Sequence, residues 1–207
     1  MGVVHLGYDY GAKNRLKPGQ PRPLDDTVVR ISNTQARHIN INAQAGAFLL
    51  TNVLVNAGGE APLDHAVTIV GGSEVRIFGC TVTGAARAGL ALRQRASPQI
   101  VDSILWGNQQ AFLHESAQPS LYHCCIQGGT DEQVSDRGGN FNRDPLFTSG
   151  PGGSFYLSHA ESGQTTTSPC VNAGSEPAAF RGLDELTTRT DQSRDTAIVD
   201  VGFHYSP

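Results

Sequence analysis

Charged side chains are scarce in this chain, and neither sign of charge is in large excess. Lys, Arg, Asp and Glu together make up 16 % of the 207 residues, and the formal net charge is −4. A protein that holds a nucleic-acid backbone presents a basic surface, because it must neutralise phosphate groups. The balance of charge therefore argues against nucleic acid as a partner.

Long hydrophobic runs, leader-like segments and metal-binding cysteine pairs are missing as well. No 18 consecutive residues are apolar, so we expect no insertion into a membrane. The first residues show no charged region followed by an apolar one, so no signal peptide is visible. The four cysteines have no C-x-x-C spacing, and no acidic loop has the frame of a calcium-binding motif. The sequence predicts no metal site and no cofactor, with calcium in the acidic C-terminal loops as the alternative.

Turn-forming residues are what the chain has in abundance. It contains 24 Gly and 11 Pro, while 38 % of its residues are hydrophobic, which is enough to fill a core. No segment has apolar residues at helical spacing over ten positions. This composition favours many short strands joined by turns.

A repeat occupies the middle of the chain. The segments "VRIFGCTVTGA" (75–85), "PQIVDSILWGN" (98–108) and "PSLYHCCIQGG" (119–129) align without gaps at offsets of 23 and 21 residues, and "LTNVLVNA" (50–57) fits at an offset of 27. A period of this length, built from strands and turns alone, is typical of a β-solenoid. Stacked coils place equivalent residues in ladders, and the predicted ladders are Ile77–Ile100–Leu121, Val82–Leu105–Ile126, Cys80–Ser103–Cys124 and Gly84–Gly107–Gly128.

The repeat and the segment after it resemble the right-handed parallel β-helix repeat proteins of bacterial cell surfaces. "SPQIVDSILWGN" (97–108) is similar to one of their coils, and "YHCCIQGG" and "GNFNRDPLF", both within residues 122–147, to their last coil and its exit. "FYLSHAESGQTTTSPCVNAGS" (155–175) and "LTTRTDQSRDTAIVDVGFHY" (186–205) resemble their C-terminal closing module. The resemblance covers residues 50–205. It implies an all-β fold: a right-handed, pectate-lyase-like parallel β-helix with an irregular C-terminal cap, in a secreted or cell-surface protein.

We expect three parts in the chain. Residues 1–26 hold an opening strand and a Pro-rich segment, residues 27–137 hold four to five coils, and residues 138–207 form a closing module that caps the C-terminal end of the coils. The opening phrase "VVHLGYDY" (3–10) matches the closing phrase "IVDVGFHY" (198–205). We interpret the opening copy as the tail of a preceding closing module, which predicts a fragment of a longer tandem protein. The opening strand is expected to pack near the N-terminal coils or to extend a sheet edge.

One face of the coils offers a candidate binding surface. An alignment that turns Leu113 inward places Arg93, Phe112 and His114 on the outward face, with Arg95 next along the chain. The cationic groups could contact an acidic sugar, with the phenyl ring as a platform for stacking. An ordinary solvated face is the alternative reading.

The same face argues against catalysis. It carries no carboxylate in this alignment, because Glu115 falls in the neighbouring column. A glycoside hydrolase needs two carboxyl groups, and a calcium-dependent lyase needs a base and carboxylates that hold the ion. We therefore expect a non-catalytic extracellular or cell-surface module that binds polysaccharide. The alternative is a carbohydrate-active enzyme, a lyase or a hydrolase, with its cleft lined by acids of the exit loop and closing module, because a fold does not determine a function.

The cysteines suggest one cross-link. Adjacent residues of a strand face opposite sides, so Cys125 points away from the inward Cys124 and could meet Cys170 of the closing module. A Cys125–Cys170 disulfide would tie the module to the last coil, and it requires an oxidising compartment such as the cell exterior. For Cys80 and Cys124 we expect buried free thiols that pack as small apolar groups.

Overall fold

The computed structural model describes residues 3–7, 28–43, 46–71 and 74–207. The Pro-rich segment and the last part of the opening phrase, both predicted from the sequence, lie outside these residues. No helix in the described part of the chain has the length and apolar character needed to cross a membrane.

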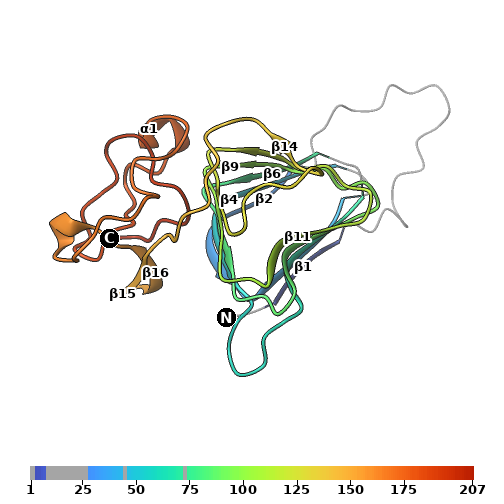
Figure 1. Cartoon of the computed structure of the whole chain (residues 1–207), viewed down its shortest axis with the longest axis horizontal. Helices are drawn as coiled ribbons and strands as arrows, with labels where there is room; N and C mark the ends of the chain where they lie inside the picture. The colour runs from blue at the N-terminus through green and yellow to red at the C-terminus, as the bar shows by residue number, and fades with distance from the viewer. Residues whose placement is uncertain (1–2, 8–27, 44–45, 72–73) are drawn as a thin grey trace.

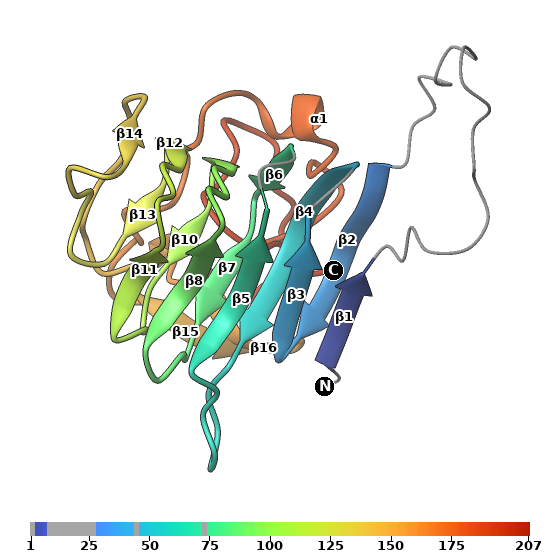
Figure 2. The same cartoon turned by 90° about the vertical axis from the view of Figure 1, so that its right-hand side faces the viewer.

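Two parallel sheets run along a β-solenoid of about four turns, which confirms the predicted fold class (Figure 1). Figure 2 shows the strands stacked from β1 and β2 at one end to β13 and β14 at the other. The five-stranded sheet contains β1 (Val3–Gly7), β3 (His38–Asn42), β5 (His65–Val70), β8 (Ala88–Arg93) and β11 (Gln110–His114). The nine-stranded sheet contains β2 (Val28–Ala36), β4 (Ala47–Asn56), β6 (Val75–Phe78), β7 (Thr81–Thr83), β9 (Gln99–Val101), β10 (Ile104–Leu105), β12 (Ser120–Tyr122), β13 (Cys125–Ile126) and β14 (Ser135–Asp136).

The register of the nine-stranded sheet confirms the ladders predicted from the repeat. Leu50, Ile77, Ile100 and Leu121 pair in succession, and all four are at most 1 % exposed. The second aliphatic ladder of the prediction is present as well. Like residues from successive turns therefore stack in the lumen and exclude water from it, which makes this column a main source of stability.

A bend recurs at one position of every turn in the nine-stranded sheet. The residues at the bend are Asn33, Asn52, Gly79, Asp102 and His123, and their φ angles lie between 48° and 55°. Few residues tolerate this left-handed conformation, and Gly, Asn, Asp and His are the ones enriched in it. We call this column the bend ladder. It splits the wall into two facets.

The predicted glycine ladder marks a second turn. Gly84, Gly107 and Gly128 have φ angles of 77°, 74° and 85°, a region that residues with a Cβ rarely adopt. The repeated glycine is therefore a requirement of the corner that follows the nine-stranded sheet.

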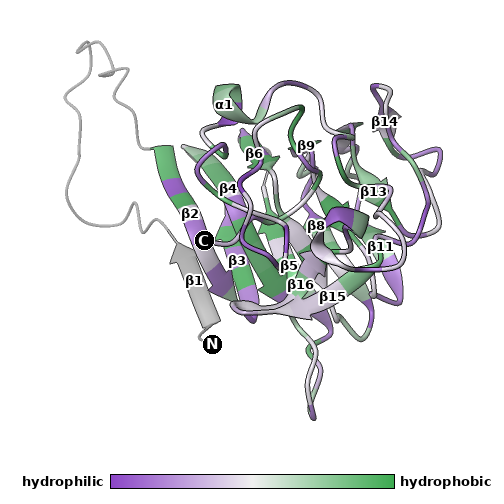
Figure 3. Ribbon diagram, turned by 90° about the vertical axis from the view of Figure 1, so that its left-hand side faces the viewer, coloured by the Kyte–Doolittle hydropathy of each residue, from purple (hydrophilic) through white to green (hydrophobic). Residues whose placement is uncertain are grey.

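Residues 138–207, which we call the cap, lie beside the solenoid (Figure 1). The cap contains the antiparallel hairpin β15 (Phe147–Gly150) and β16 (Gly153–Leu157), the 3-10 turn η1 (Ala160–Ser162) and the short helix α1 (Ala178–Arg181); most of the rest is irregular. In Figure 3 the solenoid strands carry much of the hydrophobic colour, and they lie behind the cap.

The expectation that this module covers the C-terminal end of the coils is wrong, because it packs on their flank. Gly202 donates its N–H to the carbonyl of Asp102, and Phe203 donates its N–H to the Thr81 hydroxyl. These contacts cross several coils. The polar bend ladder supplies partners along the flank, whereas an end of the stack offers only strand edges.

The two copies of the repeated phrase fold differently. Val3–Gly7 forms β1, which pairs in parallel with β3 and extends the five-stranded sheet at its N-terminal edge. This confirms one of the two expectations for the opening strand. The closing copy, residues 198–205, forms no strand of its own and lies across the flank of the solenoid. Neighbouring backbone groups, more than the phrase itself, decide which structure it adopts.

Candidate functional site in the cap

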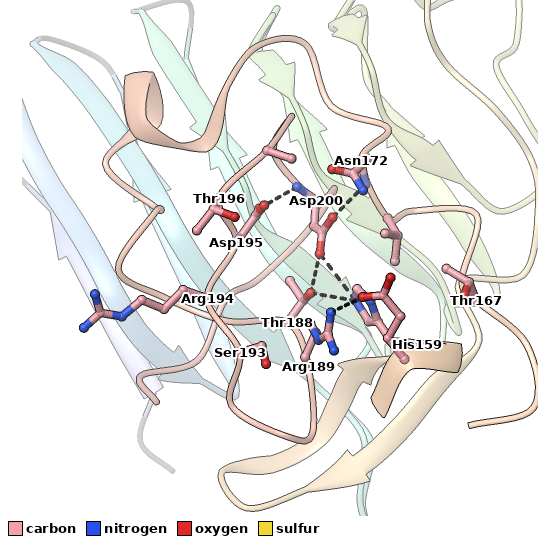
Figure 4. A pocket seen from close by; sticks show the side chains of 13 residues that line it. His159, Thr167, Asn172, Thr188, Arg189, Ser193, Arg194, Asp195, Thr196 and Asp200 are labelled. Carbon is pink, nitrogen blue, oxygen red and sulfur yellow. Dashed lines mark hydrogen bonds and ion pairs between the residues drawn. The ribbon is translucent and has the colours of Figure 1, made fainter. Parts of the chain in front are cut away.

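A hollow of about 330 Å³ opens in the cap, and we call it the bowl (Figure 4). Its floor is made of four buried side chains, and its rim of exposed polar ones. The floor contains His159, Thr188, Asp195 and Asp200, and the rim includes Glu161, Thr167, Asn172, Ser193, Arg194 and Thr196.

Asp200 is the most heavily bonded group of the floor. Its Oδ1 accepts the backbone N–H of Asn172 at 2.7 Å, and its Oδ2 accepts the Thr188 hydroxyl and lies 3.5 Å from Nε2 of His159. Burial by itself would raise the pKa of the Asp200 carboxyl, but the hydrogen bonds from His159 and Thr188 bring it below its usual value. The carboxylate is therefore an anion held in place by its donors.

Asp195 forms a second buried pair, with His204. Nε2 of His204 lies 2.9 Å from Oδ2 of Asp195, and Nδ1 lies 3.0 Å from the carbonyl oxygen of Gly202. Both ring nitrogens face acceptors, which is the arrangement of an imidazolium ion paired with a carboxylate. The acid and the histidine of the closing phrase, Asp200 and His204, thus take separate partners.

The two arginines of the bowl differ in their availability. Arg189 is enclosed by carboxylates, with 2.7 Å contacts to both Glu161 and Asp191, and these contacts raise its pKa. Arg194 has one partner, Glu185, and more than half of its side chain is exposed. Exposed ion pairs of this kind contribute little and open readily, so the Arg194 guanidinium is free to meet a ligand.

The bowl suits hydrogen bonding better than proton transfer. Asp200 already accepts several donors, and the Thr188 hydroxyl donates to it and is 1 % exposed, so neither group faces a substrate as acid or nucleophile. Both hydrogen bonds to Asp195 go to Oδ2, which leaves Oδ1 as an acceptor. The rim adds hydroxyl, amide and guanidinium groups around it.

The structure does not bring together the binding surface predicted from the sequence. His114 stands opposite Leu92, and Phe112 stands opposite Leu90, so both belong to the inward-facing register of the five-stranded sheet. Phe112 is 8 % exposed and packs in the lumen. The predicted alignment is wrong by one residue, because β8 and β11 are offset by 22 residues where it assumed 21, and a slip of one flips every side chain.

The other members of that surface are also placed differently. Arg93 does face outward, but Glu115 follows it in register and lies 3.5 Å from its Nε. The expectation of a carboxylate-free face is therefore wrong. Arg95 is exposed and lies in a turn after β8, with φ at 63°.

The cysteines are placed as expected, and all four are free thiols. Burial raises the pKa of Cys80 and of Cys124 to about 12, which makes them unreactive. Cys125 and Cys170 lie in one apolar cluster between the last coil and the cap, without a bond between them.

Sequence reasoning missed the residues of the bowl. His159 and Asp200 are 41 positions apart, and only the irregular path of the cap brings them together. The signal available in the sequence was the polar stretch at residues 187–196, which lacks any strand or helix pattern. Its acids and arginines were correctly expected to pair, as Arg189 and Asp191 do.

Comparison of the chain with protein-family models, with curated proteins and with solved structures gives no match. In the described part of the chain, no three side chains of His, Cys, Asp or Glu converge on a point where a metal ion could sit. The bowl is thus interpreted from its own geometry.

Proposed function

We propose that this protein is a non-catalytic β-solenoid module that binds polysaccharide through the bowl of its cap. The observation that carries the proposal is the division of labour in the bowl. Its floor acids are occupied by internal hydrogen bonds, while its rim offers unengaged neutral donors and acceptors. A volume of about 330 Å³ is at the small end of ligand sites, which suits one or two sugar units of a longer chain.

The ligand chemistry follows from the groups present. Oδ1 of Asp195 can accept a hydroxyl proton, and Arg194 and Asn172 can donate to hydroxyl oxygens. The floor holds two carboxylates, so a neutral, hydroxyl-rich sugar fits it better than a sulfated or carboxylated one. The solenoid supports the cap as a rigid base.

The proposal extends to the setting of the module. We propose a secreted or cell-surface location, of the kind found for the bacterial β-helix proteins that the chain resembles. The matching phrases at residues 3–10 and 198–205 are the ground for proposing that such modules occur in tandem.

A carbohydrate-active enzyme is the competing function. Three carboxyl groups, those of Glu161, Asp195 and Asp200, line one hollow, and paired carboxylates are what glycoside hydrolysis uses. The hydrogen bonds that already saturate Asp200 count against it.

The test is a screen of the purified protein on neutral and acidic polysaccharides, with and without calcium. It reads both retention on the polysaccharide and the appearance of new reducing or unsaturated ends. We expect retention on a neutral polysaccharide without cleavage. Arg194→Ala and Thr196→Ala should each weaken retention about tenfold, because each removes a hydrogen-bonding group.

Arg95→Ala is the matched control, since it removes an exposed arginine from the predicted coil surface and leaves the bowl intact. If Arg95→Ala abolishes retention while the two bowl variants keep it, the binding site lies on the coils. New chain ends that disappear in Asp195→Asn would instead establish the enzyme.

A further inference from the structure

Cys125 and Cys170 face one another across the junction between the solenoid and the cap. Cys125 belongs to β13 in the last coil, and Cys170 lies in the cap, 45 residues later. Both are completely buried. They share one apolar cluster with Ile104 and Val201, and Trp106 packs against it.

A short stretch of the exit segment holds both cysteines. The Cys125 thiol lies 3.1 Å from the carbonyl oxygen of Arg143. Two residues further on, the carbonyl oxygen of Pro145 accepts the hydroxyl of Ser168 at 2.6 Å, and that hydroxyl accepts the N–H of Cys170 at 3.1 Å. The backbone of Cys170 also accepts the N–H of Val201. Residues on every side therefore fix the two thiols near each other.

The thiols interact directly. A hydrogen bond with Cys170 lowers the pKa of Cys125, and the same contact raises the pKa of Cys170. A thiol with a lowered pKa reacts more readily as a thiolate, so Cys125 would be the attacking sulfur and Cys170 the resolving one.

We propose that Cys125 and Cys170 are a disulfide-forming pair that locks the cap onto the last coil when a low-molecular-weight disulfide serves as oxidant. The Cys125 thiolate attacks the oxidant and releases one small thiol. Cys170 then loses its proton and attacks Sγ of Cys125, which releases the second small thiol. One S–S bond forms in the protein, and one is reduced in the oxidant, so electrons and protons balance.

Burial sets the order of events. Because both thiols are sealed in the docked cap, the oxidant reaches them before the cap docks or while it is open. Cys124 is adjacent in sequence but packs in the lumen with Cys80, so neither competes for Cys170. The proposal is independent of sugar binding, and it makes the junction covalent only under oxidising conditions.

The test is refolding of the full chain with oxidised glutathione, followed by peptide mapping of disulfides and by thermal unfolding. We expect a single Cys125–Cys170 disulfide and a melting temperature about 8 to 16 °C above that of the reduced protein, because the bond closes a loop of about 45 residues. The same oxidant added to the folded, reduced protein should react far more slowly.

Cys80→Ser and Cys124→Ser are the matched controls, and either should still form the bond. Cys125→Ser and Cys170→Ser should each lose the bond and the rise in melting temperature. Four free thiols in the refolded wild type, or a mapped bond between any other pair, would overturn the proposal. The wild-type map decides the matter even if a variant fails to fold.

Discussion

Asn52 and His204, 152 positions apart, make a reciprocal pair of hydrogen bonds that joins the solenoid to the cap. Nδ2 of Asn52 donates to the carbonyl oxygen of His204 at 2.9 Å, and the N–H of His204 donates to Oδ1 of Asn52 at 2.6 Å. An amide side chain has the same donor and acceptor as a peptide group, so Asn52 pairs with the closing phrase as a strand would.

Asn52→Gly should destabilise the protein by about 2–4 kcal/mol. The change keeps a residue that tolerates the left-handed bend, but it leaves the buried N–H and carbonyl of His204 without partners. Asn52→Ala should cost about 1–2 kcal/mol more, because Ala is strained at a φ of 52°. Urea unfolding measures both. Asn33→Gly, at the exposed end of the bend ladder, is the control and should cost under about 1 kcal/mol; equal losses would refute the pairing.

Gly84→Ala and Gly128→Ala separate backbone strain from steric clash. Both glycines have a positive φ, but a Cβ at Gly84 would lie 2.5 Å from the nitrogen of Gly58, whereas nothing lies within 4 Å of one at Gly128. We expect a loss of about 1–2 kcal/mol at Gly128 and of about 3 kcal/mol or more at Gly84. Thermal unfolding of the two variants checks the order, and a larger loss at Gly128 would contradict the described stacking.

Phe112→Ala tests the register of β11. The ring is in the lumen, so its removal leaves a cavity and should cost about 3–5 kcal/mol. Leu113→Ala removes a half-buried, outward side chain from the next position and should cost much less. The alignment made from the sequence predicts the opposite order, and chemical denaturation of the two variants distinguishes the alternatives.

Stability should fall at acid pH in a way that depends on Asp200. The folded-state pKa of this carboxyl is lowered, so its contribution is present above the pKa of the unfolded chain, which is about 4. It is lost as pH falls through the lower folded pKa. Urea unfolding between pH 7 and pH 2 should show a smaller loss for Asp200→Asn than for the wild type, although the variant is weaker at pH 7. An unchanged acid loss would mean that Asp200 is not the responsible group.

The coils could be predicted in detail because each ladder repeats at short range. Residues such as Ile77 and Ile100 occupy equivalent places in successive turns, and the glycine after each strand meets the same backbone requirement every time. Where the spacing between turns changed from one wall to the other, the prediction failed. The insertion of one residue between β8 and β11 turned Phe112 and His114 into the lumen.

The sequence by itself determined the parallel solenoid, its inward ladders and the proximity of Cys125 to the cap, because stacking couples each residue to its equivalent one turn away. Only the tertiary structure decided that the cap lies along the flank and that His159, Thr188 and Asp200 meet in a bowl. Those contacts join segments with no common period, and they depend on which buried polar groups find partners when an irregular chain packs against the bend ladder.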